Sequence, residues 1–541
     1  MMSMPPFFIA LSQSNPVLGH LPRNSQLILE AAKQASEQDA KLLITPELSL
    51  TGYPPEDLLL RDAFIQAVDA QLKALAKDLA IYPNLRVLVG HPQRTSVGLQ
   101  NMASVLYRGE VLASYAKQKL PNHEVFDEVR YFEPGQDPCV IDLDGVKVGI
   151  IICEDAWHSG PAAQAKHHGA ALLVIPNASP YHLEKQNLRE DVARAIVLET
   201  ELPLIYLNAV GGQDELVFDG ASFALNQSGQ LVSCLPQFQE SFGVIEFKDH
   251  DLVQSEMTQL PSMEAQVYNA LVLGVKDYLG KNSFPGAIIG LSGGVDSALV
   301  LAIAVDALGA DKVRAVMMPS RYTADISWID ARQMAENLGV QYDEINIAPM
   351  VDAFDASLAK EFDGLPVDAT EENIQARVRG TLLMALSNKS GRIVLTTGNK
   401  SEMAVGYCTL YGDMAGGFAV IKDIAKTLVY RLCHYRNSIA PVIPERILTR
   451  APSAELRPDQ KDQDSLPEYE VLDAILSLYM EQDESIEAII AKGYLAADVE
   501  KVTRLIKINE YKRRQAPIGV RITQRAFGRD WRYPITNQFR A

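Results

Sequence analysis

The first half of the chain alternates short apolar runs with turns, from residue 7 to about residue 245. The apolar runs read FFIALSQ, KLLITPE, RVLVGHP, VKVGIII, ALLVIPNAS and LPLIYLNAV, and helical stretches lie between several of them. Apolar runs of this length, bounded by turn-forming residues, are typical of buried strands. Their alternation with helices predicts a layered α/β domain.

A polar stretch separates this region from a second one. The sequence FKDHDLVQSEMTQLPS, from about Phe247 to Ser262, shows neither helical nor strand periodicity and predicts a linker. We therefore expect a first domain at residues 1–247, a linker at 248–262 and a second domain at 263–541. The second domain opens with the predicted helix MEAQVYNALVLGVKDYLGK.

The second domain continues as a βαβ succession. Such a succession predicts a parallel sheet that binds its ligands at the carboxyl ends of the strands. The predicted elements are, in order, strand AIIGL, a helix at Ser297–Leu308, strand VRAVMMP, a helix around Ile326–Leu338, strand YDEINI, a helix from about Ile374, and strand RIVLTTG.

Length and composition favour two globular domains. A chain of 541 residues is too long for one ordinary core, and 47% of its residues are apolar while 22% are charged. No repeat is present, and no window reaches about 18 uninterrupted apolar residues. The first residues, MMSMPPFFIALSQSNP, lack a basic segment followed by a long apolar one. We therefore expect a cytoplasmic enzyme with no membrane partner.

Charge and cysteine content exclude several classes of protein. The formal net charge of −18 opposes binding to nucleic acids and anionic membranes. Anionic small molecules would need local donors, such as glycine-rich turns. The cysteines show no CxxC pair and fit neither a disulfide framework nor a zinc site; they are Cys139, Cys153, Cys234, Cys408 and Cys433.

A glycine-rich loop follows the first strand of the second domain. AIIGL runs directly into SGGVDS and then into an apolar helix, so Gly293 and Gly294 lie where the backbone turns sharply. The free N–H groups of the turn and the helix dipole favour an anion there, and Ser292 and Ser297 add hydroxyl donors. The loop has neither the Walker A lysine nor the GxGxxG spacing. A glycine turn with a serine N-cap is the purely structural alternative.

SGGVDS resembles the pyrophosphate-binding loop of the ATP-pyrophosphatase superfamily. The resemblance implies a Rossmann-like parallel α/β domain that cleaves ATP between its α and β phosphates to adenylate an oxygen of its substrate. Asp296 would hold Mg²⁺ between the phosphates, because this cation prefers carboxylate and phosphate oxygens. The loop alone leaves NAD synthetase, GMP synthetase, argininosuccinate synthetase and tRNA-thiolating enzymes open. The implied ATP-binding residues of the loop are Gly290, Leu291, Ser292, Gly293, Gly294, Val295, Asp296 and Ser297.

Three later segments together resemble the NAD synthetase family. They are ENIQARVRG, which ends at Gly380, TTGNKSEMAVGYCTLYGD at 396–413, and PSAELRPDQKDQDSLPEYEVLD at 452–473. The resemblance implies ATP contacts for Thr397 and Lys426, a second Mg²⁺ carboxylate at Glu402, and a deamido-NAD site. The residues implied for that site are Asn373, Arg377, Glu402 and Lys512.

The chemistry of these residues suits an anionic substrate, although two of them have a plainer interpretation. Lysines and Mg²⁺ would neutralise part of the negative charge of a nicotinate, a pyrophosphate and ATP. Taken alone, Arg377 is equally an ordinary residue of a helix surface. Lys512 belongs to a YKRR run, which by itself is typical of a solvated face.

The first domain offers the residues of a thiol amidase at the ends of predicted strands. ITPELSL supplies Glu47, YAKQKLPN supplies Lys117 and GIIICEDAW supplies Cys153. In such an amidase the carboxylate accepts the thiol proton, the cysteine attacks, and the ammonium stabilises the oxyanion. Alternatively, Cys153 has only a structural role, as a small apolar residue that continues its strand. The polar EDAW that follows instead predicts a thiolate at the exit of the strand, exposed and reactive.

PEL-x₃-GYPPEDLL, K-x₂-LPN and CEDAW, in this order, resemble the carbon–nitrogen hydrolase family. The resemblance implies an αββα nitrilase-type sandwich, a further catalytic carboxylate at Glu128, and glutamine contacts for Ser179 and Lys185. Glu128 is otherwise a surface loop residue. His123 stands where the family usually has tyrosine beside the glutamine, so we expect it to keep that position. Its neighbours form no recognisable set of metal ligands.

The two resemblances together imply one coupled reaction. Ammonia released from L-glutamine at Cys153 would amidate deamido-NAD after adenylation by Mg²⁺ and ATP, yielding NAD, AMP, diphosphate and glutamate. We expect an enclosed passage for ammonia, activation of the glutaminase by deamido-NAD and ATP, and a homodimer or higher homo-oligomer. Another glutamine amidotransferase and a nonenzymatic protein on a decayed scaffold are the alternatives. The presence of Glu47, Lys117, Cys153, Asp296 and Glu402 argues against decay.

Overall fold

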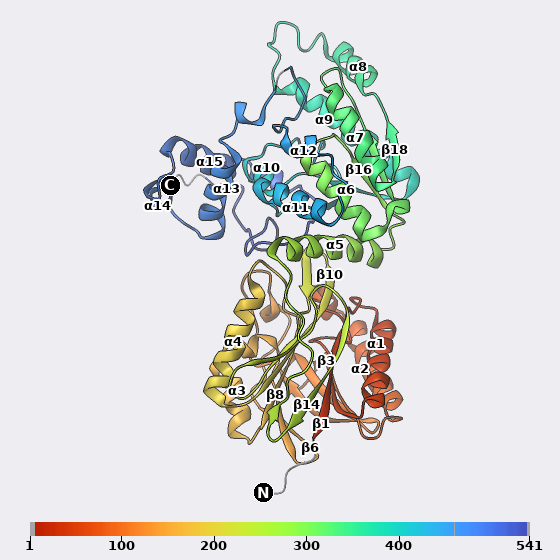
Figure 1. The fold of residues 1–541 in the computed structure, drawn as a ribbon, viewed down its shortest axis with the longest axis vertical. Coiled ribbons are helices and arrows are strands. Elements are labelled where there is room, and N and C mark those ends of the chain that lie inside the picture. The colour runs from red at the N-terminus through yellow and green to blue at the C-terminus, as the bar shows by residue number, and fades with distance from the viewer. Residues whose placement is uncertain (1–5, 459, 538–541) are drawn as a thin grey trace. The chain divides into compact units, whose positions relative to one another are not determined.

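The computed structural model describes residues 6–458 and 460–537, and within them the chain forms two units. The first unit runs to Gln213 and again from Val217 to Pro261. The second unit contains Asp214–Leu216 and continues from Ser262. Helices and strands alternate in both units, as the apolar runs predict (Figure 1).

Two β-sheets form the centre of the first unit. One has the strand order β15-β14-β1-β2-β3-β4-β5 and the other β13-β12-β9-β8-β7-β6. Strands β1 to β3 are parallel, as are β7 to β9, and their outer neighbours pair antiparallel. The first sheet contains β1 (Phe7–Gln13), β2 (Ala40–Ile44), β3 (Arg86–Arg94), β4 (Leu99–Tyr107), β5 (Glu110–Ala116), β14 (Ser241–Lys248) and β15 (Asp251–Leu252). The second contains β6 (Cys139–Leu143), β7 (Val146–Ile150), β8 (Leu172–Asn177), β9 (Leu204–Asn208), β12 (Phe223–Leu225) and β13 (Leu231–Cys234).

Side chains that alternate along the strands build the layers of this unit. Ile9 and Leu11 belong to the core shared by the two sheets, whereas Ala10 between them belongs to the core under the outer helices. Helices α1 (Leu21–Glu37) and α2 (Asp62–Leu79) cover the first sheet, and α3 (Ser159–His167) and α4 (Lys185–Thr200) cover the second (Figure 1). The first unit is therefore an αββα sandwich, as predicted.

Short elements connect these layers. Three 3₁₀ helices follow strand ends or loops, and a small hairpin of β10 and β11 forms a separate pair. Their bounds are η1 (Glu56–Leu60), η2 (Glu128–Arg130), η3 (Cys153–Trp157), β10 (Val210–Gln213) and β11 (Leu216–Asp219). The stretch at 248–262, predicted as a linker, begins at the end of β14 and contains β15, which pairs with β14 through Leu252 and Phe247. Its apolar residues are too few for a visible pattern.

The second unit is built on a parallel sheet with the strand order β18-β17-β16-β19-β20. This is the Rossmann-like sheet that the βαβ succession predicts. In helix α6, residues 297–304 are all buried and, except for Ser297, apolar, so this stretch packs on all sides against the sheet and the neighbouring helices. The strands are β16 (Ala287–Gly290), β17 (Val313–Met317), β18 (Gln341–Glu344), β19 (Ile393–Thr396) and β20 (Phe418–Ala419).

Helices cover this sheet and extend beyond it. Those that accompany the sheet are α5 (Met263–Lys281), α6 (Val295–Leu308), η4 (Ala310–Lys312), α7 (Asp325–Leu338), α8 (Ala348–Leu358), α9 (Ala369–Ser390), α10 (Lys400–Val405), α11 (Lys426–Ile439) and α12 (Glu445–Thr449). A separate apolar cluster joins α10 to the later helices and to Trp531. Those later helices are η5 (Asp462–Asp464), α13 (Tyr469–Leu476), η6 (Ser477–Glu481), α14 (Ile486–Ala491), α15 (Ala496–Ile508) and α16 (Glu510–Arg513).

No helix in the described part of the chain is both long enough and apolar enough to cross a membrane.

Candidate active sites

Three strand ends bring the predicted amidase residues to one edge of the sandwich. Glu47 follows β2, Lys117 follows β5 directly, and Cys153 follows β7. The ammonium of Lys117 lies 2.7 Å from Glu47 Oε1 and 2.8 Å from Glu128 Oε1, and all three side chains are buried. The structure therefore joins Glu47, Lys117 and Glu128 into one ionic cluster, and Glu128 is not a surface residue.

The cluster raises the pKa of Lys117 and also that of Glu128, so that the lysine stays charged and this carboxylate is easily protonated. Burial lowers the pKa of Lys117, but the carboxylates of Glu128 and Glu47 outweigh it and hold that pKa well above its usual value. Burial raises the pKa of Glu128 to about 7, against the opposing charge of Lys117. Lys117 is thus a permanent ammonium, which is what the stabilisation of an oxyanion requires.

Cys153 begins η3 in a left-handed backbone conformation, with φ of 44°. Only 4% of the residue is exposed, so the expectation of an exposed thiolate is wrong. Burial, reinforced by the negative charge of Glu47, holds the pKa of the Cys153 thiol well above its usual value. The thiol is therefore protonated at rest and needs a base to take its proton.

Asp155 ties the turn of Cys153 to the segment of Lys117. Its Oδ2 accepts hydrogen bonds from Ile152 N at 3.0 Å and from Tyr115 OH at 2.8 Å. Its Oδ1 accepts from the backbone N–H groups of Gln118 at 3.1 Å and Lys119 at 2.7 Å. One buried carboxylate thus fixes the backbone directly before the nucleophile and directly after the cation.

The three predicted glutamine-binding residues lie on segments that border η3. Lys185 Nζ stands 4.5 Å above the ring of Trp157, the last residue of η3. The His123 side chain is 57% exposed and its Nε2 lies 3.5 Å from Glu154 Oε1. Ser179 is buried, and its Oγ accepts a hydrogen bond from Arg189 Nε at 3.1 Å.

A buried ion pair between Arg189 and Asp219 holds the segment of Ser179 in place. Arg189 donates to both oxygens of Asp219, at 2.8 and 3.0 Å, and to the backbone oxygen of Ser179 at 2.7 Å. The neighbouring Ala178 N donates to Glu47 Oε2 at 3.1 Å. The segment that carries Ser179 therefore reaches the amidase cluster through Glu47.

In the second unit, the glycine-rich loop forms the predicted cradle between β16 and α6. Gly293 has φ of 79°, and a Cβ there would lie 2.3 Å from the backbone oxygen of Ser327, so only glycine fits. Gly294 is the N-cap of α6 and its N–H donates to Ser292 Oγ at 3.2 Å. Ser297 Oγ donates to the oxygen of Gly294 at 3.0 Å. Gly290, Leu291 and Val295 complete the passage from strand to helix.

Lys426 brings the two predicted metal carboxylates together. Its ammonium lies 2.5 Å from Asp296 Oδ2 and 3.2 Å from Glu402 Oε1. Burial raises the pKa of Glu402 to about 8, although Lys426 acts in the opposite direction. Both carboxylates therefore contact the same ammonium, that of Lys426.

The other predicted residues of this unit occupy neighbouring segments. Asn373 Oδ1 accepts from Thr409 Oγ1 at 2.8 Å, and the exposed Arg377 donates from Nε to Leu410 O at 3.2 Å. Lys512 Nζ donates to the backbone oxygens of Gly406 at 2.8 Å and Cys408 at 2.9 Å, so it does not lie on a solvated face. All three therefore contact the loop between α10 and β20.

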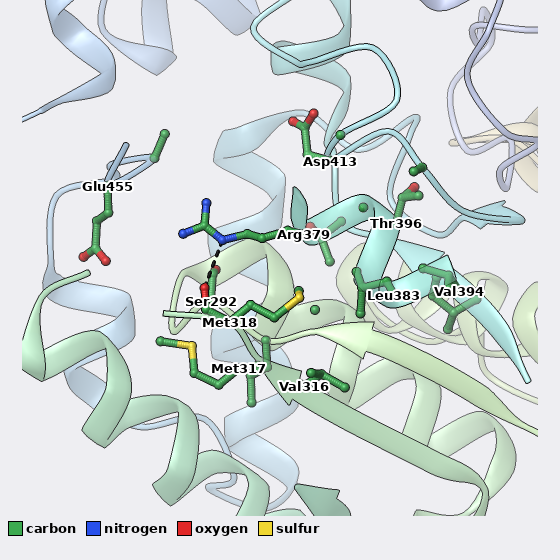
Figure 2. Close-up of a pocket in the computed structure, with 18 of the residues that line it drawn as sticks. Ser292, Val316, Met317, Met318, Arg379, Leu383, Val394, Thr396, Asp413 and Glu455 are labelled. Atoms are coloured by element: carbon green, nitrogen blue, oxygen red, sulfur yellow. Dashed lines mark hydrogen bonds between the residues drawn. The ribbon is translucent and has the colours of Figure 1, made fainter. Parts of the chain in front are cut away.

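A pocket opens beside the glycine-rich loop, at the carboxyl ends of β16, β17 and β19 (Figure 2). Its empty volume, including the mouth, is about 800 Å³. Thr397 and Ser292 line it together with apolar side chains, and Arg379 reaches across it from α9, donating from Nε to Met318 O at 3.0 Å (Figure 2). An apolar pocket next to an anion cradle suits the base and phosphates of a nucleotide.

Comparison with known proteins assigns each unit to a protein family. The carbon-nitrogen hydrolase family matches residues 8–254 and the NAD synthase family matches residues 267–516. A glutamine-dependent NAD(+) synthetase of Acinetobacter baylyi is 49% identical over 99% of this chain and 99% of its own length. The corresponding protein of Xylella fastidiosa is 47% identical over 98% of this chain and 99% of its own.

The chain belongs to the glutamine-dependent NAD(+) synthetase family.

A solved structure supports the same assignment. The glutamine-dependent NAD(+) synthetase of Acinetobacter baumannii, in complex with ADP, superposes with a TM-score of 0.80 at 46% identity. The alignment covers 98% of this chain and 99% of that one. As a glutamine-dependent NAD(+) synthetase, the chain is an enzyme, and the two resemblances found in its sequence are confirmed.

Sequence reasoning missed three polar residues that orient this synthetase's predicted groups. Asn101 Nδ2 donates to Glu47 Oε1 at 2.8 Å, and Tyr53 OH donates to Glu128 Oε1 at 2.8 Å. Asn399 Nδ2 donates to Asp296 Oδ1 at 2.9 Å. Asn101 carried a weak signal, because it is a polar residue within the mainly apolar strand LQNMASVLY.

The family's use of ATP implies a divalent cation, and the donor set fits one that also binds phosphates. Within residues 6–458 and 460–537, no group of three or more His, Cys, Asp or Glu side chains could hold a metal ion alone. Asp296 and Glu402 supply two carboxylates, a donor set that fits a divalent cation whose remaining ligands are phosphate oxygens.

Proposed function

We propose that this enzyme amidates deamido-NAD to NAD, using ATP and ammonia that it releases from L-glutamine. The products are AMP, diphosphate and glutamate, and the reaction completes the synthesis of NAD. The observation that supports the glutamine half most directly is the buried ammonium of Lys117 between Glu47 and Glu128, beside the Cys153 turn.

The first half-reaction follows from the charges around Cys153. Glu47 accepts the thiol proton, and Sγ attacks the carboxamide carbon of glutamine while Lys117 Nζ stabilises the oxyanion. The proton returns from Glu47 to the leaving nitrogen, and ammonia departs from a thioester. Glu47 then takes a proton from water, whose oxygen attacks the thioester, releases glutamate and restores the thiol.

Glu128 and the glutamine-binding residues assist this step. Glu128 keeps Lys117 in place, since it shares the ammonium with Glu47. Ser179, Lys185 and His123 border η3, and we assign them to the glutamine molecule itself.

The second half-reaction uses the glycine-rich loop. Residues 290–297 receive the phosphates of ATP, and Thr397 and Lys426 contact the nucleotide. Asp296 and Glu402 would hold Mg²⁺, which neutralises phosphate charge when bound. The nicotinate carboxylate attacks the α-phosphorus, diphosphate leaves, and ammonia then displaces AMP from the acyl adenylate. Asn373, Arg377, Glu402 and Lys512 would orient the deamido-NAD.

An assay with two nitrogen sources tests the proposal. The purified enzyme is incubated with ATP, Mg²⁺ and deamido-NAD, and with either glutamine or ammonium, while NAD is measured. We expect NAD from both sources. Formation of NAD from neither would refute the function. Sedimentation of the same preparation tests the further proposal of a homodimer or higher homo-oligomer; a monomer would refute it.

A further inference from the structure

Arg379 brings a positive charge into the nucleotide pocket without a carboxylate partner. Its side chain extends from α9 into the pocket, and its Nε donates to Met318 O at 3.0 Å (Figure 2). Among the residues that the structure describes, no other hydrogen bond and no ion pair reaches this guanidinium. The bond to Met318 O holds the side chain, and its two terminal nitrogens are available to a ligand.

The surroundings of Arg379 make its charge costly unless an anion joins it. Burial lowers the pKa of Arg379 to about 10, and the negative charge of Glu455 offsets only part of this effect. The guanidinium is therefore still protonated at neutral pH. Buried charges are normally paired, because a charge removed from water loses its hydration. An anionic ligand in the pocket would supply the missing partner.

The other charged side chains of the pocket repel a nucleotide phosphate. Among the described residues that line it, Arg379 is the only cation, whereas Asp413 and Glu455 are carboxylates. Lys426 is a further cation at the glycine-rich loop, but its ammonium already contacts two carboxylates. Arg379 is thus the cation of this pocket that a phosphate can approach without displacing an ion pair.

The α-phosphate of ATP would lie where the pocket meets the glycine-rich loop. Ser292 of that loop lines the same pocket as Arg379 (Figure 2). The base of a nucleotide suits the apolar side chains of the pocket, and the β and γ phosphates suit the cradle. Because the α-phosphate joins these two parts of ATP, it comes within reach of a cation on the pocket wall.

We propose that the terminal nitrogens of Arg379 bind the non-bridging oxygens of the ATP α-phosphate, which makes Arg379 a catalytic residue of the adenylation step. The inference rests on the synthetase function proposed above. In that step the nicotinate carboxylate forms a bond to the α-phosphorus. The bond from this phosphorus to the bridging oxygen breaks, and its electron pair leaves with diphosphate. Carboxylate and α-phosphate repel each other, and the guanidinium offsets that repulsion as the two approach.

The test compares the binding of AMP, which carries only the α-phosphate, with that of adenosine, which carries none. Dissociation constants are measured by calorimetric titration of the wild type, Arg379→Gln, and the matched control Arg504→Gln, whose side chain is exposed on α15. A charge-assisted hydrogen bond corresponds to about tenfold to hundredfold in affinity. We expect the preference for AMP over adenosine to be smaller by this factor in Arg379→Gln than in the other two proteins. The affinity for adenosine should be the same in all three.

Turnover separates a catalytic role of Arg379 from a structural one. In ammonium-driven NAD synthesis at saturating ATP, Arg379→Gln should lose about a hundredfold or more in kcat. Arg379→Lys keeps the positive charge and should recover part of this loss.

Three results would overturn the inference: an unchanged preference for AMP in Arg379→Gln, an equal loss of affinity for AMP and adenosine, or equal losses of kcat in Arg379→Gln and Arg379→Lys. If adenosine binds too weakly to titrate, the comparison of kcat values decides alone. Absence of NAD formation by the wild type would instead refute the synthetase function, and the difference between AMP and adenosine would still report on Arg379.

Discussion

Replacement of Lys117 by methionine should destabilise the first unit and abolish its glutaminase activity. The change keeps an unbranched side chain, one atom shorter, but removes the ammonium that pairs with Glu47 at 2.7 Å and Glu128 at 2.8 Å. Two buried carboxylates then face each other without a cation. Removal of one partner from a buried ion pair costs about 3–5 kcal/mol. For a unit of this size, that loss corresponds to a fall in Tm of about 6–20 °C.

The destabilisation should depend on pH in a defined direction. In the wild type, burial raises the pKa of Glu128 to about 7, and without Lys117 this pKa rises further. A group whose folded-state pKa is raised contributes stability below its unfolded-state pKa, near 4.5, and loses that contribution as pH rises through the folded value. Lys117→Met should therefore lose less stability at pH 5 than at pH 8.

Thermal unfolding at these two pH values measures both effects. The double variant Lys117→Met with Glu128→Gln is the control, because it removes one of the unpaired carboxylates and should recover part of the loss at pH 8. Ammonium-driven NAD synthesis at low temperature reports whether the second unit is intact. The reasoning is refuted if the free energy of unfolding of Lys117→Met at pH 8 lies less than about 1 kcal/mol below that of the wild type. It is also refuted if the double variant is no more stable than Lys117→Met.

The remaining predictions concern the division of labour between the units. Cys153→Ala should abolish NAD formation from glutamine and spare it from ammonium; loss of both activities in a folded variant would contradict the two-site mechanism. Asp296→Ala should stop NAD formation from both nitrogen sources while glutamine hydrolysis by the first unit persists, and retained synthesis would remove Asp296 from the ATP site. Gly293→Ala should abolish synthesis, because its Cβ would lie 2.3 Å from Ser327 O at a φ of 79°; wild-type KM for ATP would show that the loop adapts. An enclosed passage predicts little free ammonia in solution during turnover, whereas ammonia released at the full glutaminase rate without deamido-NAD would argue against the passage and against activation.

The sequence predicts the elements well because apolar periodicity is local. The helix expected at Ser297–Leu308 is observed as Val295–Leu308, and the one expected around Ile326–Leu338 as Asp325–Leu338. The helix expected from about Ile374 begins at Ala369, five residues earlier, since a capping box of Asp368 and Glu371 starts it on polar residues. Strand β15 was not predicted, because a strand of two residues shows no periodicity.

Sequence motifs predicted which residues form the candidate sites, but not how these residues are buried and which groups they contact. Glu47, Lys117 and Cys153 each follow a strand, as the motifs predict, but these strands are not neighbours: β3 and β4 separate β2 from β5, and β7 belongs to the other sheet. The packing of the two sheets brings the three residues together, and sequence motifs do not show that packing. The burial of Cys153 depends on packing around η3, and the bridge of Lys426 between Asp296 and Glu402 joins residues up to 130 positions apart. Neither follows from local pattern, because both depend on contacts between distant segments.

The four hydrogen bonds of Asp155 have a consequence for the motion of the glutaminase site. The turn before Cys153 and the backbone after Lys117 both attach to this single carboxylate. We therefore expect a displacement of Asp155 to move both loops together, so that their separation changes less than the position of either. This shared attachment would keep the spacing between Cys153 Sγ and Lys117 Nζ even if the two loops move.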